Sequence, residues 1–263
     1  MPPGVAAMSF KLLQMALFVL GLASIPIAAE PLADRCANLA PAADLSACDL
    51  SGRSFTGLDL TGANFSGAKL ENANLLGARL DGADLRGANL KWANLRRASL
   101  RNTDLREADL FHATLDEADM SSAHVGKANL FGTNLIDTRA IGADFSGAYL
   151  KDVLMEGIDL SGGSLADTYM LRGVMTGGRF VNANLSRADM TGAAAEACDF
   201  TNADLSGTRL LGASLRGATF KNTKLKGADF SNADLFNAVF DGAHDLPPSL
   251  MEAVERRLGF KPE

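Results

Sequence analysis

The sequence predicts a repeat architecture, a solenoid built from many copies of one five-residue unit, and not a globular domain of ordinary helices and strands. A large apolar residue recurs at every fifth position from 45 to 240, and only Val125, Ala140 and Ala195 depart from Leu, Phe or Met. A small residue usually stands two positions earlier. A spacing of five matches neither the period of about 3.6 of a helix nor the period of about 2 of a strand. An unbroken period of this kind is typical of repeat proteins.

The units follow the motif A-D/N-L-x-G, as in residues 63–67 (A-N-F-S-G) and 88–90 (A-N-L). On these units, residues 43–243 resemble the pentapeptide-repeat family. The resemblance implies an all-β fold, a right-handed quadrilateral β-helix (solenoid) of about ten coils with four units per coil. It also implies that the central residue and the small residue two before it point inward. Residues twenty apart then stack on one side of the rod.

The composition agrees with this architecture. Two inward residues on each side share a narrow interior, so one is large and the other is Ala, Thr or Gly. Corners between sides favour Gly, Asn and Asp, which tolerate unusual backbone angles. These corners account for much of the 26 Gly.

The N-terminal region differs from the repeat. Lys11 precedes an apolar run at residues 12–29 that ends in small residues, which predicts a Sec signal peptide over residues 1–29 with cleavage before Glu30. The alternative is an uncleaved membrane anchor, because the run is near the lower limit for a membrane span. Cleavage predicts a periplasmic or secreted bacterial protein, with residues 30–42 as an N-terminal cap segment.

Residues 244–263 predict a short C-terminal capping helix and tail. Pro247 and Pro248 end the repeat, and S-x-x-E at residues 249–252 has the form of a capping box with Ser249 as the N-cap. The apolar stripe of this helix is expected to dock on the last coil and cover its open edge; it comprises Leu250, Met251, Val254 and Leu258. A homodimer formed through the same helix is an alternative.

The three cysteines fit an oxidising compartment. Cys36 precedes the rod and Cys48 occupies an inward small position in the first coil, so a disulfide between them would staple the cap segment to the stack. The alternative is that both are unpaired. Cys198 is expected to be a buried free thiol, because many coils separate it from Cys48.

One side of the rod, face B, has its repeat centres at 50, 70 and every twentieth residue onward to 230. Stacking gathers large apolar residues on its outer surface, and such a strip commonly marks a binding surface. The candidate partner surface comprises Trp92, Phe111, Phe131, Tyr149, Tyr169, Leu171 and Leu211. Lys91, His112 and Arg172 are expected to supply its polar edge. The alternative is that the rings lie flat over their own corners.

The repeat is least regular from Val153 to Gly178. Some inward small positions hold larger residues such as Ile158, others hold Gly, and Met replaces Leu at several centres. This pattern predicts local repacking, with either a bend or bulge in the rod or simple drift of a tolerant repeat.

No catalytic constellation is present. His112, His124 and His244 fall on different faces or at the end of the rod, and the motifs of zinc proteases, phosphate loops and nucleophile elbows are missing. We therefore expect no enzyme activity, no metal and no cofactor. The net charge of −6 disfavours nucleic acid and, once the signal is cleaved, membrane as partners.

These observations predict a non-enzymatic exported structural or protein-interaction rod with an unknown protein partner. The alternative comes from the resemblance, because some pentapeptide-repeat proteins mimic duplex DNA and protect DNA gyrase. The acidic charge is compatible with that function, whereas the export signal argues against it.

Overall fold

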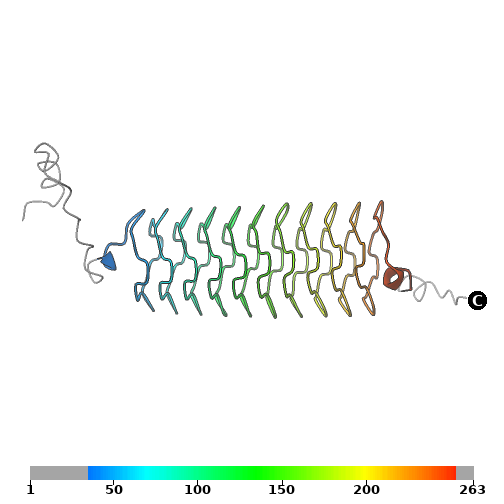
Figure 1. The fold of residues 1–263 in the computed structure, drawn as a ribbon, viewed down its shortest axis with the longest axis horizontal. Coiled ribbons are helices and arrows are strands. Elements are labelled where there is room, and N and C mark those ends of the chain that lie inside the picture. Colours follow the sequence, from blue (N-terminus) through cyan, green and yellow to red (C-terminus); the bar gives the residue numbers. More distant parts are fainter. Residues whose placement is uncertain (1–34, 253–263) are drawn as a thin grey trace, which may run out of the picture. The chain divides into compact units, whose positions relative to one another are not determined.

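The computed structural model describes residues 35–252. These residues belong to the second of the two compact units of the chain, Leu32–Glu263. The predicted signal peptide, residues 1–29, lies outside the described residues, as do Val254 and Leu258 of the predicted C-terminal helix. Within residues 35–252 the chain winds into a regular rod of stacked coils (Figure 1).

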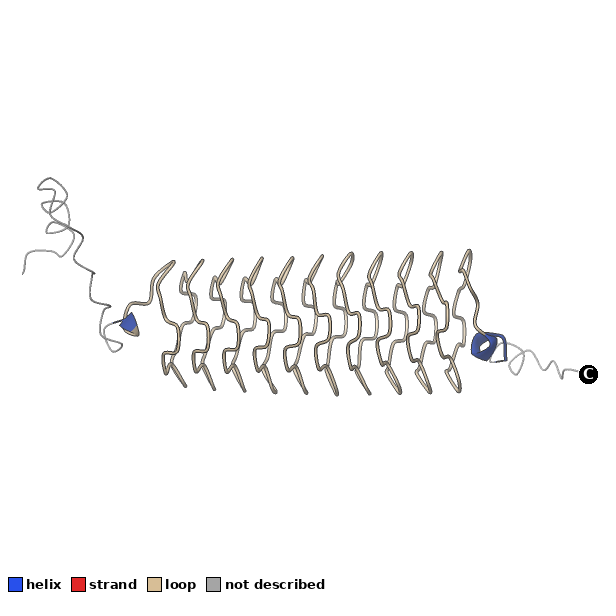
Figure 2. Ribbon diagram, viewed as in Figure 1, coloured by secondary structure: helices blue, strands red, loops and turns tan. Residues whose placement is uncertain are grey.

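Parallel pairing joins residues that are twenty apart, from Asp44 with Asn64 to Lys224 with His244, with one bridge in every five residues. Each bridge joins a single residue of one coil to a single residue of the next. Residues 35–252 therefore contain isolated bridges and no strand of two or more residues (Figure 2). The backbone of Asp84 illustrates the pairing, because its N–H donates to Ala63 O at 2.9 Å while Leu85 N donates to Asp104 O at 2.7 Å. Four five-residue units therefore make up each coil.

Every unit ends in a tight turn. The carbonyl of the central residue accepts a hydrogen bond from the N–H three residues later, as when Ala88 N donates to Leu85 O at 3.0 Å. The residue two after the centre has positive φ, 62° at Gly87 and 60° at Trp92, which is the pattern of a type II turn. Between 42 and 242 no Val, Ile or Thr occupies such a position. A β-branched side chain is strongly disfavoured at positive φ.

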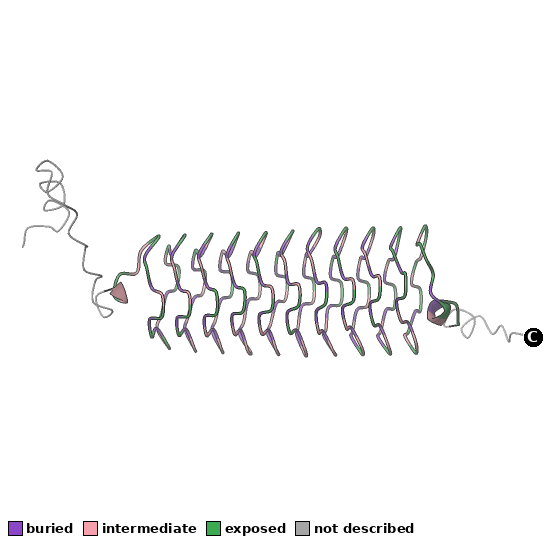
Figure 3. Ribbon diagram, viewed as in Figure 1, coloured by how far each residue is buried: buried purple, intermediate pink, exposed green. Residues whose placement is uncertain are grey.

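The core is a stack of inward side chains in which large and small residues alternate. Buried segments recur from coil to coil along the ribbon (Figure 3). An aromatic column forms inside the C-terminal half, with ring centroids 5.2 Å apart for Phe180 and Phe200 and 5.1 Å apart for Phe200 and Phe220. Thr at a small position keeps its hydroxyl satisfied, because Thr103 Oγ1 donates to Leu80 O at 2.9 Å. Burial therefore leaves these hydroxyls with partners.

The irregular segment from Val153 to Gly178 keeps the regular pairing, which contradicts the expected alternative of a bulge. Size changes compensate one another along the stack. Val153 is fully buried, and one coil later the position holds Gly173, where an added Cβ would lie 3.2 Å from Val153 Cγ1. The larger residue in one coil is thus accommodated by a missing side chain in the next.

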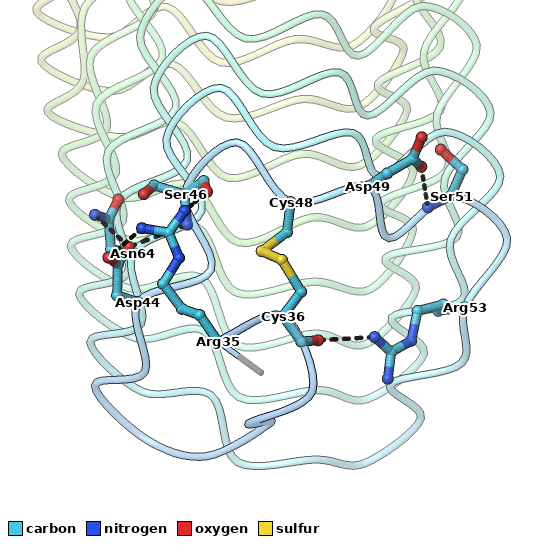
Figure 4. The surroundings of a disulfide bond; sticks show 9 residues. All are labelled: Arg35, Cys36, Asp44, Ser46, Cys48, Asp49, Ser51, Arg53 and Asn64. Atoms are coloured by element: carbon cyan, nitrogen blue, oxygen red, sulfur yellow. Dashed lines mark hydrogen bonds and ion pairs between the residues drawn. A yellow bond between two sulfur atoms is a disulfide. The ribbon is translucent and has the colours of Figure 1, made fainter. Parts of the chain in front are cut away.

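The N-terminal end of the rod is fastened by a disulfide between Cys36 and Cys48, whose Cα atoms are 5.6 Å apart (Figure 4). Two arginines hold the same segment. Arg35 bonds the Asp44 carboxylate at 2.9 Å and Ser46 O at 2.8 Å, and Arg53 donates to Cys36 O at 2.9 Å. The guanidinium of Arg35 therefore satisfies a carbonyl that in later coils accepts from a backbone N–H.

At the C-terminal end residues 248–252 are helical and Leu250 is buried against the core. The predicted capping role of Ser249 is wrong, since the helix begins one residue earlier. The Ser249 hydroxyl instead accepts from Phe230 N at 3.1 Å and donates to Ala228 O at 3.3 Å. It thereby replaces the partners that a further coil would supply. Within residues 35–252 no helix has the length and apolar character needed to cross a membrane.

Candidate functional site

The candidate partner surface lies on face B and on the corner that follows it. Tyr149 and Tyr169 occupy the outward position between two inward residues, and they pair directly across neighbouring coils. Phe111 and Phe131 occupy the first corner position, and Trp92 occupies the second, where φ is 60°. The register of twenty residues per coil thus brings together rings that are far apart in sequence.

These rings form one continuous series of contacts. Phe111 and Phe131 stack with centroids 5.4 Å apart, Phe131 and Tyr149 at 6.2 Å, and Tyr149 and Tyr169 at 5.3 Å. Trp92 meets Phe111 edge-on at 5.5 Å. The series crosses face B obliquely, because it moves from the corner column at Trp92 to the middle column at Tyr169.

His112 belongs to this series, which corrects its expected place in a polar edge. Its imidazole stacks on the Trp92 indole at 4.5 Å with an interplanar angle of 9°, and it contacts Phe111 and Phe131 edge-on. The polarity of His112 indicates a polar edge, whereas its position twenty residues after Trp92 is the signal that predicts stacking on the indole. We call the connected set the ring ladder; it comprises Trp92, Phe111, His112, Phe131, Tyr149 and Tyr169.

The ring ladder is open to solvent. Trp92 is 52% exposed and Tyr149 is 40% exposed, and the other rings are half-buried by their neighbours. The parallel packing of Phe111 on Phe131 and of Tyr149 on Tyr169 disagrees with the alternative that each ring lies flat over its own corner. A contiguous series of surface rings, exposed at Trp92 and Tyr149, is the feature that distinguishes this side of the rod.

Leu171 and Leu211 are half-buried residues of the same corner column as Phe131, but other residues interrupt that column. Lys151 occupies the coil between Phe131 and Leu171, and Thr191 occupies the coil between Leu171 and Leu211. A second apolar column, missed from the sequence, stands on the neighbouring face, where Leu154 pairs with Val174 and Val174 with Ala194. The signal in the sequence is the recurrence of apolar residues at outward positions that are twenty residues apart on that face.

Some of the cations beside the ring ladder form ion pairs with carboxylates, and others do not. Lys91 pairs with Asp109 at 3.1 Å, and Arg172 makes a two-point contact with Asp152, with both distances 2.8 Å. Lys151 Nζ instead lies 5.8 Å from the centroid of the Phe131 ring. Lys127 and Lys151 have no ion pair with any residue of 35–252.

Other chemically active residues are dispersed. In residues 35–252 no three His, Cys, Asp or Glu side chains lie close enough together to hold a metal ion. Cys198 is a buried free thiol whose Sγ donates to Met175 O at 3.0 Å. Burial raises the pKa of this thiol to about 12, so it carries no reactive thiolate at neutral pH.

Several solved structures are similar to this chain. One is HetL from the cyanobacterium Nostoc, a pentapeptide repeat protein involved in heterocyst differentiation regulation, at 27% identity over 75% of this chain and 90% of that one, with a TM-score of 0.43. Another is QnrB1, a plasmid-mediated fluoroquinolone resistance protein, at 20% identity over 86% and 98% of the two chains and a TM-score of 0.31. A third is a pentapeptide repeat protein of the Arabidopsis thaliana thylakoid lumen, at 28% identity over 55% and 66% and a TM-score of 0.21.

Comparison with curated proteins finds no match. The family model described as pentapeptide repeats matches in eight copies, which together cover residues 43–124, 128–169 and 179–244. These matches cover most of the rod, and the five-residue period and the register of twenty agree with them. The chain therefore belongs to the pentapeptide-repeat family.

Proposed function

We propose that the protein is an exported, non-enzymatic rod that binds another protein through the ring ladder. The observation that carries the proposal is the unbroken series of ring contacts on the surface from Trp92 to Tyr169, in which Trp92 and Tyr149 are exposed and the other rings are half-buried. Aromatic side chains with a nearby Arg or Lys are the usual anchors of protein interfaces. In the proposed molecule a right-handed stack of about ten coils presents this surface, and the C-terminal helix covers its last coil.

Partner capture with paired variants tests the surface. Tyr149→Ser with Tyr169→Ser removes two rings at outward positions and should weaken capture of the native partner at least tenfold, while the thermal unfolding temperature stays close to that of the parent. Ile141→Ser with Val181→Ser is the matched control, because both lie in an outward column on another side of the rod and are half-buried. Equal capture by parent and tyrosine variant would contradict the proposed surface.

Export is tested separately by cell fractionation and intact mass. A periplasmic species beginning at Glu30 supports the proposal. An uncut species in the cytoplasm would contradict it and would make a gyrase-protection assay the next experiment.

The alternative function, DNA mimicry toward gyrase, requires carboxylates that remain unneutralised along the rod. Ion pairs instead neutralise many outward carboxylates. Arg86 and Arg106 bind Asp84 and Asp104, and Arg101 binds Asp81 at 2.9 Å. This pairing favours the protein-interaction proposal.

A further inference from the structure

We propose that the ring ladder seats a single amphipathic α-helix whose apolar stripe is flanked by acidic residues. The inference rests on the proposed function and specifies the chemistry of the partner. It is argued from the spacing of the rings, from their orientation and from the charges beside them.

The spacing of the rings is closer to that of a helix than to that of a strand. Ring centroids in the same column are 5.4 Å apart for Phe111 and Phe131 and 5.3 Å apart for Tyr149 and Tyr169, and the coils that carry them repeat at about 4.8 Å. One turn of an α-helix rises about 5.4 Å, so a helix lying along the ladder departs from the coil repeat by only about 0.6 Å per turn. Side chains on one face of an extended strand recur at about 6.6 Å and would fall out of register by about 2 Å per coil.

The length of the ladder is also sufficient. From Trp92 to Tyr169 the ladder spans nearly four coils, roughly 20 Å at a strand spacing of about 4.8 Å. A helix of about 13 residues covers that length at about 1.5 Å per residue. Such a helix carries four apolar side chains on one stripe, one for each successive turn.

The orientation of the rings favours apolar side chains of a partner protein as ligands over flat sugar rings or nucleobases. Tyr149 and Tyr169 are within 12° of parallel at 5.3 Å, a spacing at which rings lying flat and side by side on the rod would overlap. Their faces are therefore turned toward one another and their edges face outward. Sugar rings and nucleobases stack on exposed ring faces, and the faces of Tyr149 and Tyr169 that are turned toward one another are not exposed to such a ligand.

The charges beside the ladder complement an acidic helix. Lys127 stands in the corner before face B and Lys151 in the corner after it, and Tyr149 lies between these two columns. Neither ammonium has an ion pair with a residue of 35–252, whereas Lys91 and Arg172 are neutralised. Glu or Asp on both sides of an apolar stripe would form ion pairs with Lys127 and Lys151 at once.

The test selects binders from two display libraries against the full chain, one of single helices on a rigid scaffold and one of extended peptides. Trp92 is the only tryptophan, so a change in its emission reports contact with the ladder. Helical binders should enrich with apolar residues at i, i+4, i+7 and i+11 flanked by Glu or Asp. Their affinity should fall at least tenfold in Tyr149→Ser with Tyr169→Ser and in Lys127→Glu with Lys151→Glu. It should not change in Lys221→Glu, an exposed lysine on another face.

The outcomes separate this inference from the proposed function. Enrichment of extended peptides that shift Trp92 emission, or self-association of the chain that the tyrosine variant abolishes, would keep the interaction surface and overturn the helix. Helical binders whose affinity is unchanged in Lys127→Glu with Lys151→Glu would contradict the proposed acidic residues beside the apolar stripe. Binders that enrich only elsewhere on the rod would contradict both proposals.

Discussion

At the scale of single residues, two kinds of glycine occur side by side for different physical reasons. Gly177 is a corner residue with φ of 70°, and a Cβ added there would meet nothing within 4 Å. Gly178 is an inward small residue, and a Cβ there would lie 2.8 Å from Met175 O and 2.8 Å from Phe180 Cε2. The first glycine relieves backbone strain, and the second leaves room for the core.

Alanine at these two positions should therefore have unequal effects. Gly178→Ala should lower the free energy of unfolding by about 1 to 3 kcal/mol, the usual cost of overpacking a close-packed interior. Gly177→Ala should lower it by about 1 kcal/mol, since Ala in the left-handed region costs roughly that amount. Denaturant unfolding of the two variants measures the difference. A larger loss for Gly177→Ala would contradict this assignment.

The pair Val153 and Gly173 offers a test of compensation between coils. Gly173→Ala places a Cβ 3.2 Å from Val153 Cγ1, which is tighter than an ordinary contact. It should be destabilising alone and less so when Val153→Ala is also present, with a coupling of about 0.5 to 1 kcal/mol in the range found for residues in contact. A double-mutant cycle of denaturant unfolding measures this coupling, and strict additivity would show that the two sites are independent.

At the scale of structural elements, the two ends of the rod are closed by different devices. The disulfide and two arginines hold the N-terminal segment, and the Ser249 hydroxyl and Leu250 hold the C-terminal helix. At each end a side chain hydrogen-bonds a backbone group that a further coil would otherwise bond. Arg35 does so at the N-terminal end and Ser249 at the C-terminal end. Ends need such devices because each coil of a solenoid is stabilised by its neighbours.

Loss of the disulfide should loosen only the end that it fastens. Cys36→Ser opens a loop with a sequence separation of 12, and loops of that size contribute about 3 kcal/mol in the chain-entropy account. Hydrogen exchange at amides of the first coil, such as Leu50, should speed up, while exchange at Leu130 should stay unchanged. Cys198→Ala is the control, because its thiol is distant and unpaired. Faster exchange along the whole rod would mean that the coils unfold as one unit.

At the scale of the whole molecule, the periodic features could be read from the sequence because every unit reports the same constraint. The inward Leu and Phe, the corner glycines and the stacking of Tyr149 on Tyr169 all follow from the period of five and the register of twenty. Features that depend on one local contact could not be read in this way. The ring of His112 joins the ladder through Trp92, and Ser249 bonds the last coil and not its own helix.

The ion pairs between arginines and aspartates on the surface of the rod should make its free energy of unfolding depend on pH at acidic values. The Arg101 guanidinium, hydrogen-bonded to Asp81, lowers the pKa of that carboxyl to about 2, and Arg86 and Arg106 lower the pKa of Asp84 and Asp104. A carboxyl whose pKa is lower in the folded state stabilises the fold while it is ionised. This stabilisation is complete above the unfolded pKa of 3.8 and is lost as the pH falls through the folded value.

Stability should therefore be constant from neutral pH to about pH 5 and should decline steadily from about pH 4 to pH 2. Urea unfolding across this range measures the decline. Asp81→Asn should lower the stability at neutral pH and flatten the part of the curve between 3.8 and about 2. Added salt should reduce the slope, because these pairs are exposed and screened. A stability that is unchanged down to pH 2 would show that the ion pairs accompany the stacking of the coils without stabilising it.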